Sequence, residues 1–145
     1  MSVTNLLKRV QLFTTLSATE LEQIEAICTE KEAEPDELII QQNTTGTGMY
    51  VIADGSVEVF IEGMDIARIL VVLGKGQVIG EMALIDQGYR SASVRATNKG
   101  ATLYRIGNDD FNKLCQENNH IGFVVMRNLA IDLAFKLRHR NLTEL

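Results

Sequence analysis

The chain contains few of the residues that build metal sites, disulfide frameworks or rigid turns. Its 145 residues include two cysteines, two histidines, one proline and no tryptophan. Cys28 and Cys115 show neither metal-site nor redox-motif spacing, so we expect packed thiols in a reducing compartment, with a disulfide as the less favoured alternative. His120 and His139 lack a cysteine or carboxylate at metal-ligand spacing, and we interpret both as surface residues of a helix. The sequence therefore predicts a protein without a metal or a redox centre.

Long hydrophobic runs and an excess of positive charge are also missing. No apolar segment approaches the length that spans a bilayer, and residues 1–9 carry no signal-peptide pattern. The net charge of −5 argues against a nucleic-acid-binding surface. With 46% hydrophobic and 23% charged residues, the composition is that of an ordinary soluble domain, and the length fits a single domain over residues 1–145. We expect a soluble, cytoplasmic protein that neither enters a membrane nor binds DNA directly.

Residue types used in catalysis are present, but not in catalytic arrangements. Ser91 and Ser93 lack the context of a nucleophile elbow. Carboxylates cluster only around Pro35, in a connector that we interpret as solvated rather than as a metal site. A metal-dependent hydrolase would need a metal cluster that the sequence does not show. The sequence predicts a binding protein and not an enzyme.

Hydrophobic periodicity changes twice along the chain. Residues 1–34 show helical spacing, residues 35–107 have the pattern of short strands between turns, and residues 108–145 are helical again. Many short strands with no helices between them favour an antiparallel sandwich or barrel. Asp54-Gly55 predicts a type I′ hairpin turn. The expected strands cover residues 38–41, 49–53, 56–61, 66–73, 93–96 and 101–106.

Two helices are expected before the strands. Apolar residues recur at helical spacing within residues 4–16. A capping-box pattern at residues 17–20 predicts the start of a second helix, which should end near Cys28.

The last segment should contain a short helix, capped by Asn108 or Asp109, and a longer helix over about residues 120–140. Apolar residues of the longer helix fall on two faces, one of which includes Ile131 and Phe135. One face can pack on the strands. For the second, we favour the same helix of another copy over a single wide stripe buried within one subunit.

The stretch at residues 76–97 combines the features of an anion-binding site. Gly80 follows the apolar pair at residues 78–79, and Glu81 comes directly after it. Residues 82–85 have the pattern of one helical turn. A glycine lets the backbone approach a ligand closely, and free N–H groups at the start of a helical turn favour a phosphate. Arg90 offers a planar fork of donors that matches phosphate oxygens. Because Glu81 would repel a phosphate, it needs a donor such as a sugar hydroxyl, so the predicted ligand is an anionic nucleotide with a free ribose hydroxyl.

Each of these residues also has a purely structural interpretation. Glu81 could be an exposed acid at a strand end, and Arg90 could be half of a surface ion pair. Those interpretations do not explain why a helical turn, a glutamate and an arginine together interrupt a run of strands. We therefore favour a binding site, with Arg95 as a structural residue rather than a second phosphate ligand.

The same stretch resembles the phosphate-binding cassette of cyclic-nucleotide-binding domains, the family of the bacterial catabolite activator protein and of the regulatory subunits of cAMP-dependent protein kinase. It implies an α+β, mainly β fold, in which an eight-stranded antiparallel jelly roll over residues 35–107 carries N-terminal helices and a long C-terminal helix. The cassette would cover residues 79–92. The resemblance rests on Gly80-Glu81-Met-Ala-Leu-Ile and Arg90-Ser91-Ala-Ser-Val-Arg-Ala, and it extends to residues 36–40, 49–59, 73–76 and 110–111.

The resemblance also implies a role for each residue of the cassette. Arg90 would pair with the cyclic phosphate, and Glu81 would accept the ribose 2′-hydroxyl. Backbone amides near Gly80, Met82, Ala83 and Ser91 would complete the phosphate cradle, and Val59, Leu70 and Val71 would form an apolar wall against the base.

The residues that would distinguish the base depart from the family pattern. In the activator, a Thr-Ser pair on the long helix contacts adenine, and the corresponding register here gives Arg140 and Asn141. Arg140 could stack on the purine and Asn141 could pair with its edge, or both could belong to an exposed helix end. Ser91 fits either base, because its hydroxyl could bond the phosphate or a guanine amino group. We expect cAMP as the ligand, with cGMP as the alternative.

The resemblance is to a sensor domain. After Arg140 too few residues remain for a DNA-reading helix. We expect a stand-alone, dimeric cyclic-nucleotide receptor whose C-terminal helix rearranges on binding and acts on a separate protein effector. The alternative is a ligand-free jelly-roll domain for interaction or assembly, which would have no need for Glu81 and Arg90 at this spacing.

Overall fold

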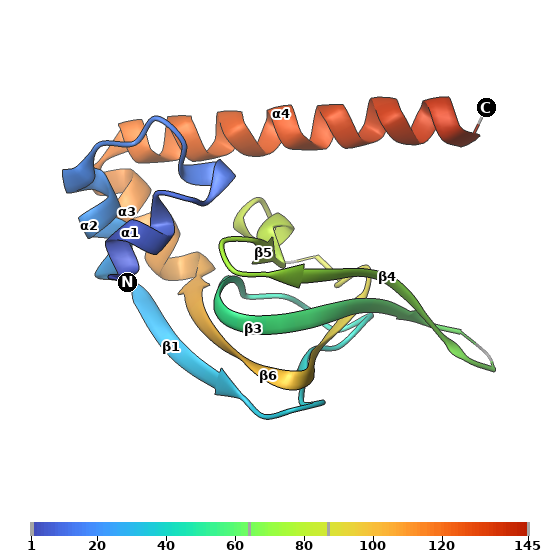
Figure 1. The fold of residues 1–145 in the computed structure, drawn as a ribbon. Coiled ribbons are helices and arrows are strands. Elements are labelled where there is room, and N and C mark those ends of the chain that lie inside the picture. The colour runs from blue at the N-terminus through green and yellow to red at the C-terminus, as the bar shows by residue number, and fades with distance from the viewer. Residues whose placement is uncertain (1, 64, 87, 145) are drawn as a thin grey trace.

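The computed structural model describes residues 2–63, 65–86 and 88–144, with side chains described as far as residue 139 (Figure 1). Helices gather at one end of a curved antiparallel sheet, and a long helix runs across the molecule above it. The strands are β1 (Cys28–Ala33), β2 (Leu38–Ile40), β3 (Gly48–Glu62), β4 (Ala67–Gly74), β5 (Val78–Ile79) and β6 (Ser93–Gly107). The helices are α1 (Val3–Leu7), α2 (Ala18–Glu25), α3 (Asn108–Glu117) and α4 (Asn119–Glu144), with 3-10 turns η1 (Gln11–Phe13) and η2 (Glu81–Leu84).

Strands β3 and β6 form the frame of the sheet. Each is 15 residues long, and the two pair with each other in antiparallel orientation. The remaining strands of the described residues attach to this frame, β4 and β5 to β3, and β1 and β2 to β6. The predicted antiparallel roll with helices at both ends of the chain is confirmed, but the described residues contain six strands instead of eight.

The difference in strand number arises at two glycines. Asp54-Gly55 does not form the expected hairpin turn, because β3 continues through it with register shifts against β6 on both sides. Gly55 has a φ of 72° and Gly100, in β6, a φ of 71°. A Cβ on Gly55 would collide with the carbonyl oxygen of Gly100. The hairpin prediction was wrong because the left-handed backbone that glycine readily adopts here bends two paired strands instead of reversing one.

The acidic segment after α2 is more ordered than expected. The predicted capping box at the start of α2 is confirmed: the Glu20 N–H donates to Ser17 Oγ and the Ser17 N–H donates to the Glu20 carboxylate, both at 3.1 Å. The helix ends at Glu25, however, and β1 then pairs with β6. Glu30, Glu32, Glu34 and Asp36 are exposed, as expected of solvated carboxylates, but residues 28–33 form a strand instead of a connector, since charged side chains are well tolerated on an edge strand.

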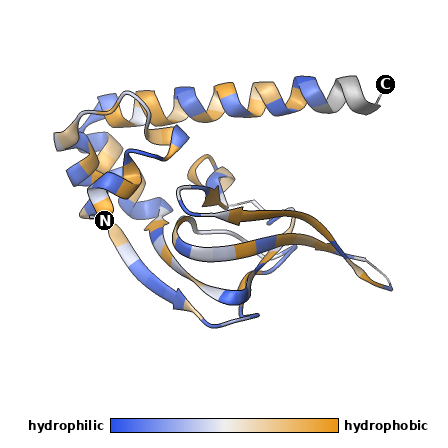
Figure 2. Ribbon diagram, in the orientation of Figure 1, coloured by the Kyte–Doolittle hydropathy of each residue, from blue (hydrophilic) through white to orange (hydrophobic). Residues whose placement is uncertain are grey.

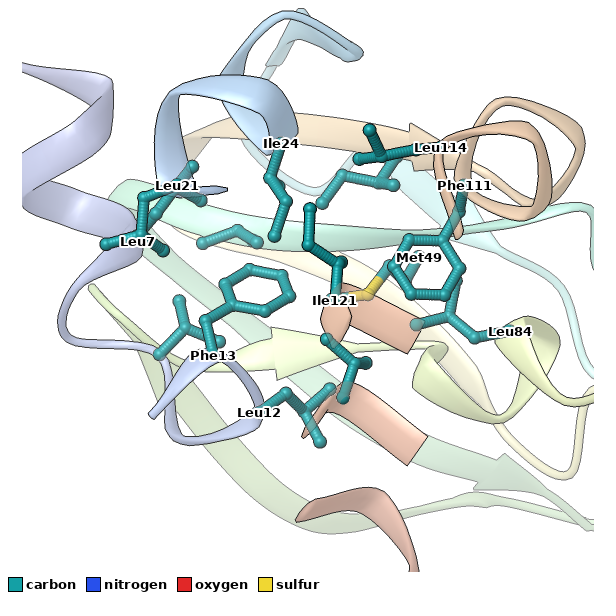
Figure 3. Packing of buried hydrophobic residues seen from close by; sticks show 14 of the residues in the cluster. Leu7, Leu12, Phe13, Leu21, Ile24, Met49, Leu84, Phe111, Leu114 and Ile121 are labelled. Carbon is teal, nitrogen blue, oxygen red and sulfur yellow. The ribbon is translucent and has the colours of Figure 1, made fainter. Parts of the chain in front are cut away.

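Two apolar clusters stabilise the fold. The larger lies between the helices and one face of β3, and it includes Phe13, Met49, Phe111 and Ile121 (Figure 3). It takes in α1 and η1, into which the single helix expected over residues 4–16 divides. The smaller cluster fills the roll between β2, β3 and β6. Both remove apolar surface from water, which is the main favourable contribution to folding.

The start of α3 links the helical end of the molecule to the cassette. Its N-cap is Gly107, not Asn108 or Asp109 as expected. Asn108 lies instead in the first turn, where it is buried and its side-chain amide donates to the carbonyl oxygen of Ala83 in η2. This shift of one position turns the asparagine from a cap into a tether between α3 and the cassette.

Both cysteines are free and half-buried, as their spacing predicts. Burial, and then the charge of Glu25, raises the pKa of the Cys28 thiol to about 12. Burial also raises the pKa of the Cys115 thiol. Because the thiolate is the reactive form, neither cysteine is prepared for nucleophilic or redox chemistry near neutral pH.

Helix α4 leaves the helical cluster and continues over the sheet (Figure 1). Its first half buries Ile121 and Leu129 in the larger apolar cluster. Further along, Ile131, Phe135 and Leu137 are 51%, 59% and 59% exposed. Figure 2 shows hydrophobic residues continuing along this half. Within the part of the chain that the structure describes, no helix combines the length and the apolar character needed to cross a membrane.

Candidate functional site

A cavity of about 720 Å³ opens between the cassette, the paired strands β3 and β4, and helix α4. Val59 of β3 and Val71 of β4 contribute apolar side chains to its wall. Asp132 and Lys136 of α4 line another side, and residues 9–12, which precede and begin η1, line a third. The cavity thus joins segments from the beginning, middle and end of the chain.

Gly80 shapes the cassette at the point where β5 ends and η2 begins. Its φ of 72° and ψ of 21° are left-handed, a conformation that glycine adopts without a steric penalty. A Cβ at this position would lie 2.5 Å from Nη1 of Arg90. The turn closes when the Ala83 N–H donates to the Gly80 carbonyl at 3.1 Å. The N–H groups of Glu81 and Met82 come before that first bond of the turn, and both residues line the cavity.

The guanidinium of Arg90 is held by two backbone carbonyls. Nη1 donates to Gly80 at 3.1 Å, and Nη2 donates to Gly48 at 2.6 Å. None of the ion pairs among the described residues includes this side chain. Burial lowers the pKa of Arg90, and the neighbouring Arg105 lowers it further while Tyr50 and Glu81 oppose the change. An arginine side chain stays charged at neutral pH, so Arg90 presents to the cavity a cation that has no direct ion-pair partner among the described residues.

The loop at residues 43–46 fixes the backbone of Arg90. The Arg90 N–H donates to the Thr44 carbonyl at 2.8 Å, and the Arg90 carbonyl accepts from the Asn43 N–H at 2.9 Å. Gly46 passes so close to the guanidinium that a Cβ there would collide with it. Position and orientation of Arg90 are therefore both set by backbone contacts, which are less mobile than contacts between side chains.

Glu81 faces a lysine of the long helix. Nζ of Lys136 lies 3.9 Å from Oε1 of Glu81 and 2.9 Å from Oδ2 of Asp132, one turn earlier in α4. The Glu81 side chain is 18% exposed and that of Lys136 is 60% exposed. The longer contact is therefore a weak, partly screened ion pair that connects the cassette to α4.

The structure brings most of the expected site residues to one cavity, but not all. Leu70 does not line the cavity, because the register of β3 and β4 shifts between Val59 and Phe60 and leaves Leu70 as the unpaired residue of a bulge. The side chains of Arg140 and Asn141 lie outside the described residues. The expected residues that do line the cavity are Val59, Val71, Gly80, Glu81, Met82, Ala83, Arg90 and Ser91.

Sequence reasoning missed Asp132 and Lys136, which the described part of α4 contributes to the cavity. It placed the contribution of this helix later, at Arg140 and Asn141. The signal that could have found the earlier pair is their spacing, because an acid and a base four residues apart lie on one helix face. Nothing in the sequence shows which face meets the cassette, since this depends on how α4 crosses the sheet.

Other charged and catalytic residue types have structural positions. Arg95 pairs with Glu58 at 2.9 Å and its guanidinium lies 4.6 Å from the ring centre of Phe60, as expected for a structural residue. Ser93 is buried and its hydroxyl accepts from the Gln42 N–H at 2.8 Å. In the described ranges, histidine, cysteine, aspartate and glutamate form no group of three that could hold a metal ion.

Known proteins show similarity over the region that contains this site. Residues 30–118 match the family model of the cyclic nucleotide-binding domain. The chain is 35% identical over 107 residues to the cyclic AMP receptor protein of Thermus thermophilus, over 72% of this chain and 46% of the receptor. The crystal structure of the Thermus thermophilus catabolite activator protein is similar with a TM-score of 0.81 and 30% identity, over 92% of this chain and 61% of that one. The regulatory domain of Toxoplasma gondii PKA, in a co-crystal structure with cAMP, gives a TM-score of 0.71 and 25% identity, over 77% and 42% of the two chains.

Fold, cassette and cavity together define a jelly-roll domain with a candidate ligand site. The extent of the family match shows that the chain belongs to the cyclic nucleotide-binding domain family, which confirms the resemblance seen in the sequence. The chain spans 25%, 46% and 15% of the length of three curated relatives that it matches.

Proposed function

We propose that the cavity binds a cyclic nucleotide, with cAMP preferred to cGMP, and that the domain is a receptor module without catalytic activity. The observation that carries this proposal is the charge arrangement: Arg90, held by two backbone carbonyls and without a carboxylate partner, lines the same cavity as Glu81. A cyclic phosphate and a ribose hydroxyl would complement these two groups. The name of the Thermus relative and the ligand in the Toxoplasma structure support cAMP.

In this proposal each group of the cassette has one task. Arg90 pairs with the phosphate, and the N–H groups of Glu81 and Met82, with those near Ala83 and Ser91, donate to its oxygens. The Glu81 carboxylate accepts from the ribose 2′-hydroxyl. The base then lies toward the apolar side chains of Val59 and Val71, where burying its faces is favourable.

The signal would leave the site through α4. A ribose hydroxyl on Glu81 competes with Lys136 for the same carboxylate, so binding weakens the contact between the cassette and the helix. A ligand shifts a conformational equilibrium by as much as its affinities for the two states differ. The helix would thereby take a new position, in which a second copy or a protein effector in the cytoplasm could contact it.

The test is isothermal titration of the protein with cAMP and with cGMP, together with Arg90→Ala. Charge-assisted hydrogen bonds contribute roughly 1.5–3 kcal/mol each. Their loss should therefore weaken binding by one to several factors of ten. Arg68→Ala is the matched control, since Arg68 is an exposed arginine of β4 that does not line the cavity. Equal affinity in the wild type and Arg90→Ala would contradict the assignment of the phosphate site.

A second candidate is an interaction or assembly domain that binds no nucleotide. The exposed apolar residues of α4 and β4 favour it, because large apolar side chains at a surface often mark a protein interface. If neither cAMP nor cGMP gave a heat of binding in calorimetry or a chemical-shift change in NMR, this candidate would be favoured over the receptor.

A further inference from the structure

A second hollow, of about 160 Å³, adjoins the nucleotide cavity at Ile40 and Arg90. It lies between the end of β2, the loop before β3, the start of β3 and the last residues of β6. Carboxylates are absent from its lining in the described part of the chain. The lining residues that carry polar side chains are Gln41, Thr44, Thr45, Thr47, Tyr50, Arg90 and Arg105.

Arg105 is the residue that gives this hollow its character. It lies opposite Tyr50 in the pairing of β6 with β3, and its Nη2 donates to the hydroxyl of Thr47 at 2.9 Å. Like Arg90, it takes part in none of the ion pairs of the described residues. Asp110, whose carboxylate lies near Gly107, forms no ion pair with it either. Two arginines, neither with a direct ion-pair partner among the described residues, therefore line one small hollow, and the charge of Glu81 acts on Arg90 from the side of the larger cavity.

Two like charges at one site raise the free energy of the folded protein unless an anion or water screens them. A tetrahedral oxyanion suits the donors present, because guanidinium groups and hydroxyls both donate to its oxygens. The size also fits: at about 30 Å³ for each water in the liquid, the hollow has room for roughly five heavy atoms.

We propose that this hollow is a second anion site, separate from the nucleotide cavity, which binds a free phosphate-sized oxyanion between Arg105 and Arg90. The hydroxyl of Thr47, which accepts from Arg105 and keeps its own proton, is an additional donor, whereas that of Thr44 already donates to the Gln41 carbonyl. Arg105 would be the principal ligand, since the guanidinium of Arg90 already donates to Gly80 and Gly48.

The two sites should be coupled through Arg90, which lines both. An anion in the hollow would reduce the attraction of Arg90 for a cyclic phosphate in the cavity. Linkage requires the effect to be reciprocal, so a cyclic nucleotide would weaken anion binding by the same factor. This coupling rests on the proposed function, whereas the anion site itself does not.

Inorganic phosphate, titrated into the protein without nucleotide and followed by two-dimensional amide NMR, tests the site. Chloride at equal ionic strength is the reference for general screening. We expect saturable shifts centred on Thr44, Thr47 and Arg105. Arg105→Gln should weaken phosphate binding roughly ten- to a hundredfold, and Arg105→Lys should retain part of it. Arg68→Gln, which neutralises an exposed arginine outside both sites, should bind as the wild type does.

Shifts no larger than those with chloride, or equal binding by Arg105→Gln and the wild type, would overturn the proposal. If Arg105→Gln fails to fold, Thr47→Val removes the hydroxyl that holds Arg105 and should weaken binding while keeping the charge.

A nucleotide titration tests the coupling of the two sites. Phosphate should raise the dissociation constant of cAMP in the wild type, and it should raise it less in Arg105→Gln. An equal effect in both would place the phosphate in the nucleotide cavity and refute a second site. Failure of cAMP to bind would leave the phosphate result unaffected.

Discussion

Arg90 is oriented by carbonyl oxygens of the main chain instead of by a carboxylate. The difference matters for an anion site, because a carboxylate partner would cancel the charge that attracts the ligand, whereas a carbonyl only directs it. Two glycines allow this arrangement. Gly80 and Gly46 both approach the guanidinium so closely that a side chain at either would displace it. In the proposed binding site, ligand affinity and backbone shape therefore depend on the same few atoms.

Gly80→Ala should affect ligand binding and stability together. A non-glycine residue in the left-handed conformation costs roughly 1–2 kcal/mol. The new Cβ would also lie 2.5 Å from Nη1 of Arg90 and force that group to move. We expect a lower free energy of unfolding in urea and, in the protein that remains folded, weaker binding of cAMP by calorimetry.

Gly74→Ala provides the control for that substitution. Gly74 lies at the end of β4, where an added Cβ would be 3.8 Å from its nearest neighbour, an ordinary contact distance. Its variant should bind cAMP as the wild type does. If Gly80→Ala also bound cAMP normally, the close approach of Gly80 to Arg90 would have no part in recognition.

At the scale of elements, Glu20 joins α2 to the junction of α3 and α4. Its carboxylate accepts from the Ser17 N–H at 3.1 Å, contacts Nδ1 of His120 at 2.8 Å and accepts from the Asn118 amide at 3.3 Å. The hydrogen bond with His120 is the largest cause that lowers the pKa of Glu20 in the folded protein. One side chain thus caps a helix and connects it to the start of α4.

Glu20→Gln should destabilise the protein in a pH-dependent way. Glutamine keeps the capping hydrogen bond but removes the charge. Because the His120 side chain of the pair is 59% exposed, although that of Glu20 is only 12% exposed, the loss should be about 1 kcal/mol. Because folding lowers the pKa of Glu20, its contribution is present above the ordinary value of about 4.3 and disappears as the pH falls through the folded-state value. Urea unfolding across a pH series should show the two proteins converging in acid. Glu22→Gln, an exposed acid on the same helix, should show a smaller difference near neutral pH.

The contact between Lys136 and Glu81 leads to a prediction about cAMP affinity and the response of α4. If nucleotide displaces Lys136 from Glu81, Lys136→Met removes that competition, and affinity for cAMP should rise up to about fivefold, the equivalent of a surface ion pair. Hydrogen exchange in α4 should also respond less to cAMP than it does in the wild type. A loss of affinity by a factor of ten or more would instead make Lys136 a direct ligand contact.

The order of helices and strands could be predicted from the sequence, and so could the cassette, because both depend on residues close together in the chain. Gly80, Glu81 and Arg90 lie within one short stretch, and local spacing was enough to propose their chemistry. The errors concern relations between distant segments. Asp54-Gly55 bends β3 because Gly100 lies opposite, and β1 forms because β6 offers an edge. The position of Lys136 beside Glu81 depends on the path of a whole helix, which local periodicity does not contain.

At the scale of the whole molecule, α4 serves two surfaces. Lys136 and Asp132 line the cavity, while Ile131, Phe135 and Leu137 are exposed to solvent. Ile131 and Phe135 are four residues apart and so share one face of the helix. Large apolar side chains on such a face fit a partner with the same surface, which a two-fold axis between identical chains provides. We therefore propose that two copies associate through this half of α4. Nucleotide binding and association would then act on the same helix.

Ile131→Glu tests this association without altering the cavity. Burying an isoleucine contributes about 1.5–3 kcal/mol, and a two-fold interface loses that amount twice, so the dimer dissociation constant should rise at least about a hundredfold. Sedimentation analysis should show a dimer for the wild type and a monomer for Ile131→Glu. Ile66→Glu, at an 81% exposed isoleucine just before β4, is the control and should remain dimeric. A monomeric wild type, or a dimer unaffected by Ile131→Glu, would refute the interface.

If the dimer forms, the effect of cAMP on its dissociation constant tests whether α4 carries the signal. A change in that constant requires, by linkage, that monomer and dimer differ in their affinity for cAMP. Such a difference would show that α4 carries the signal.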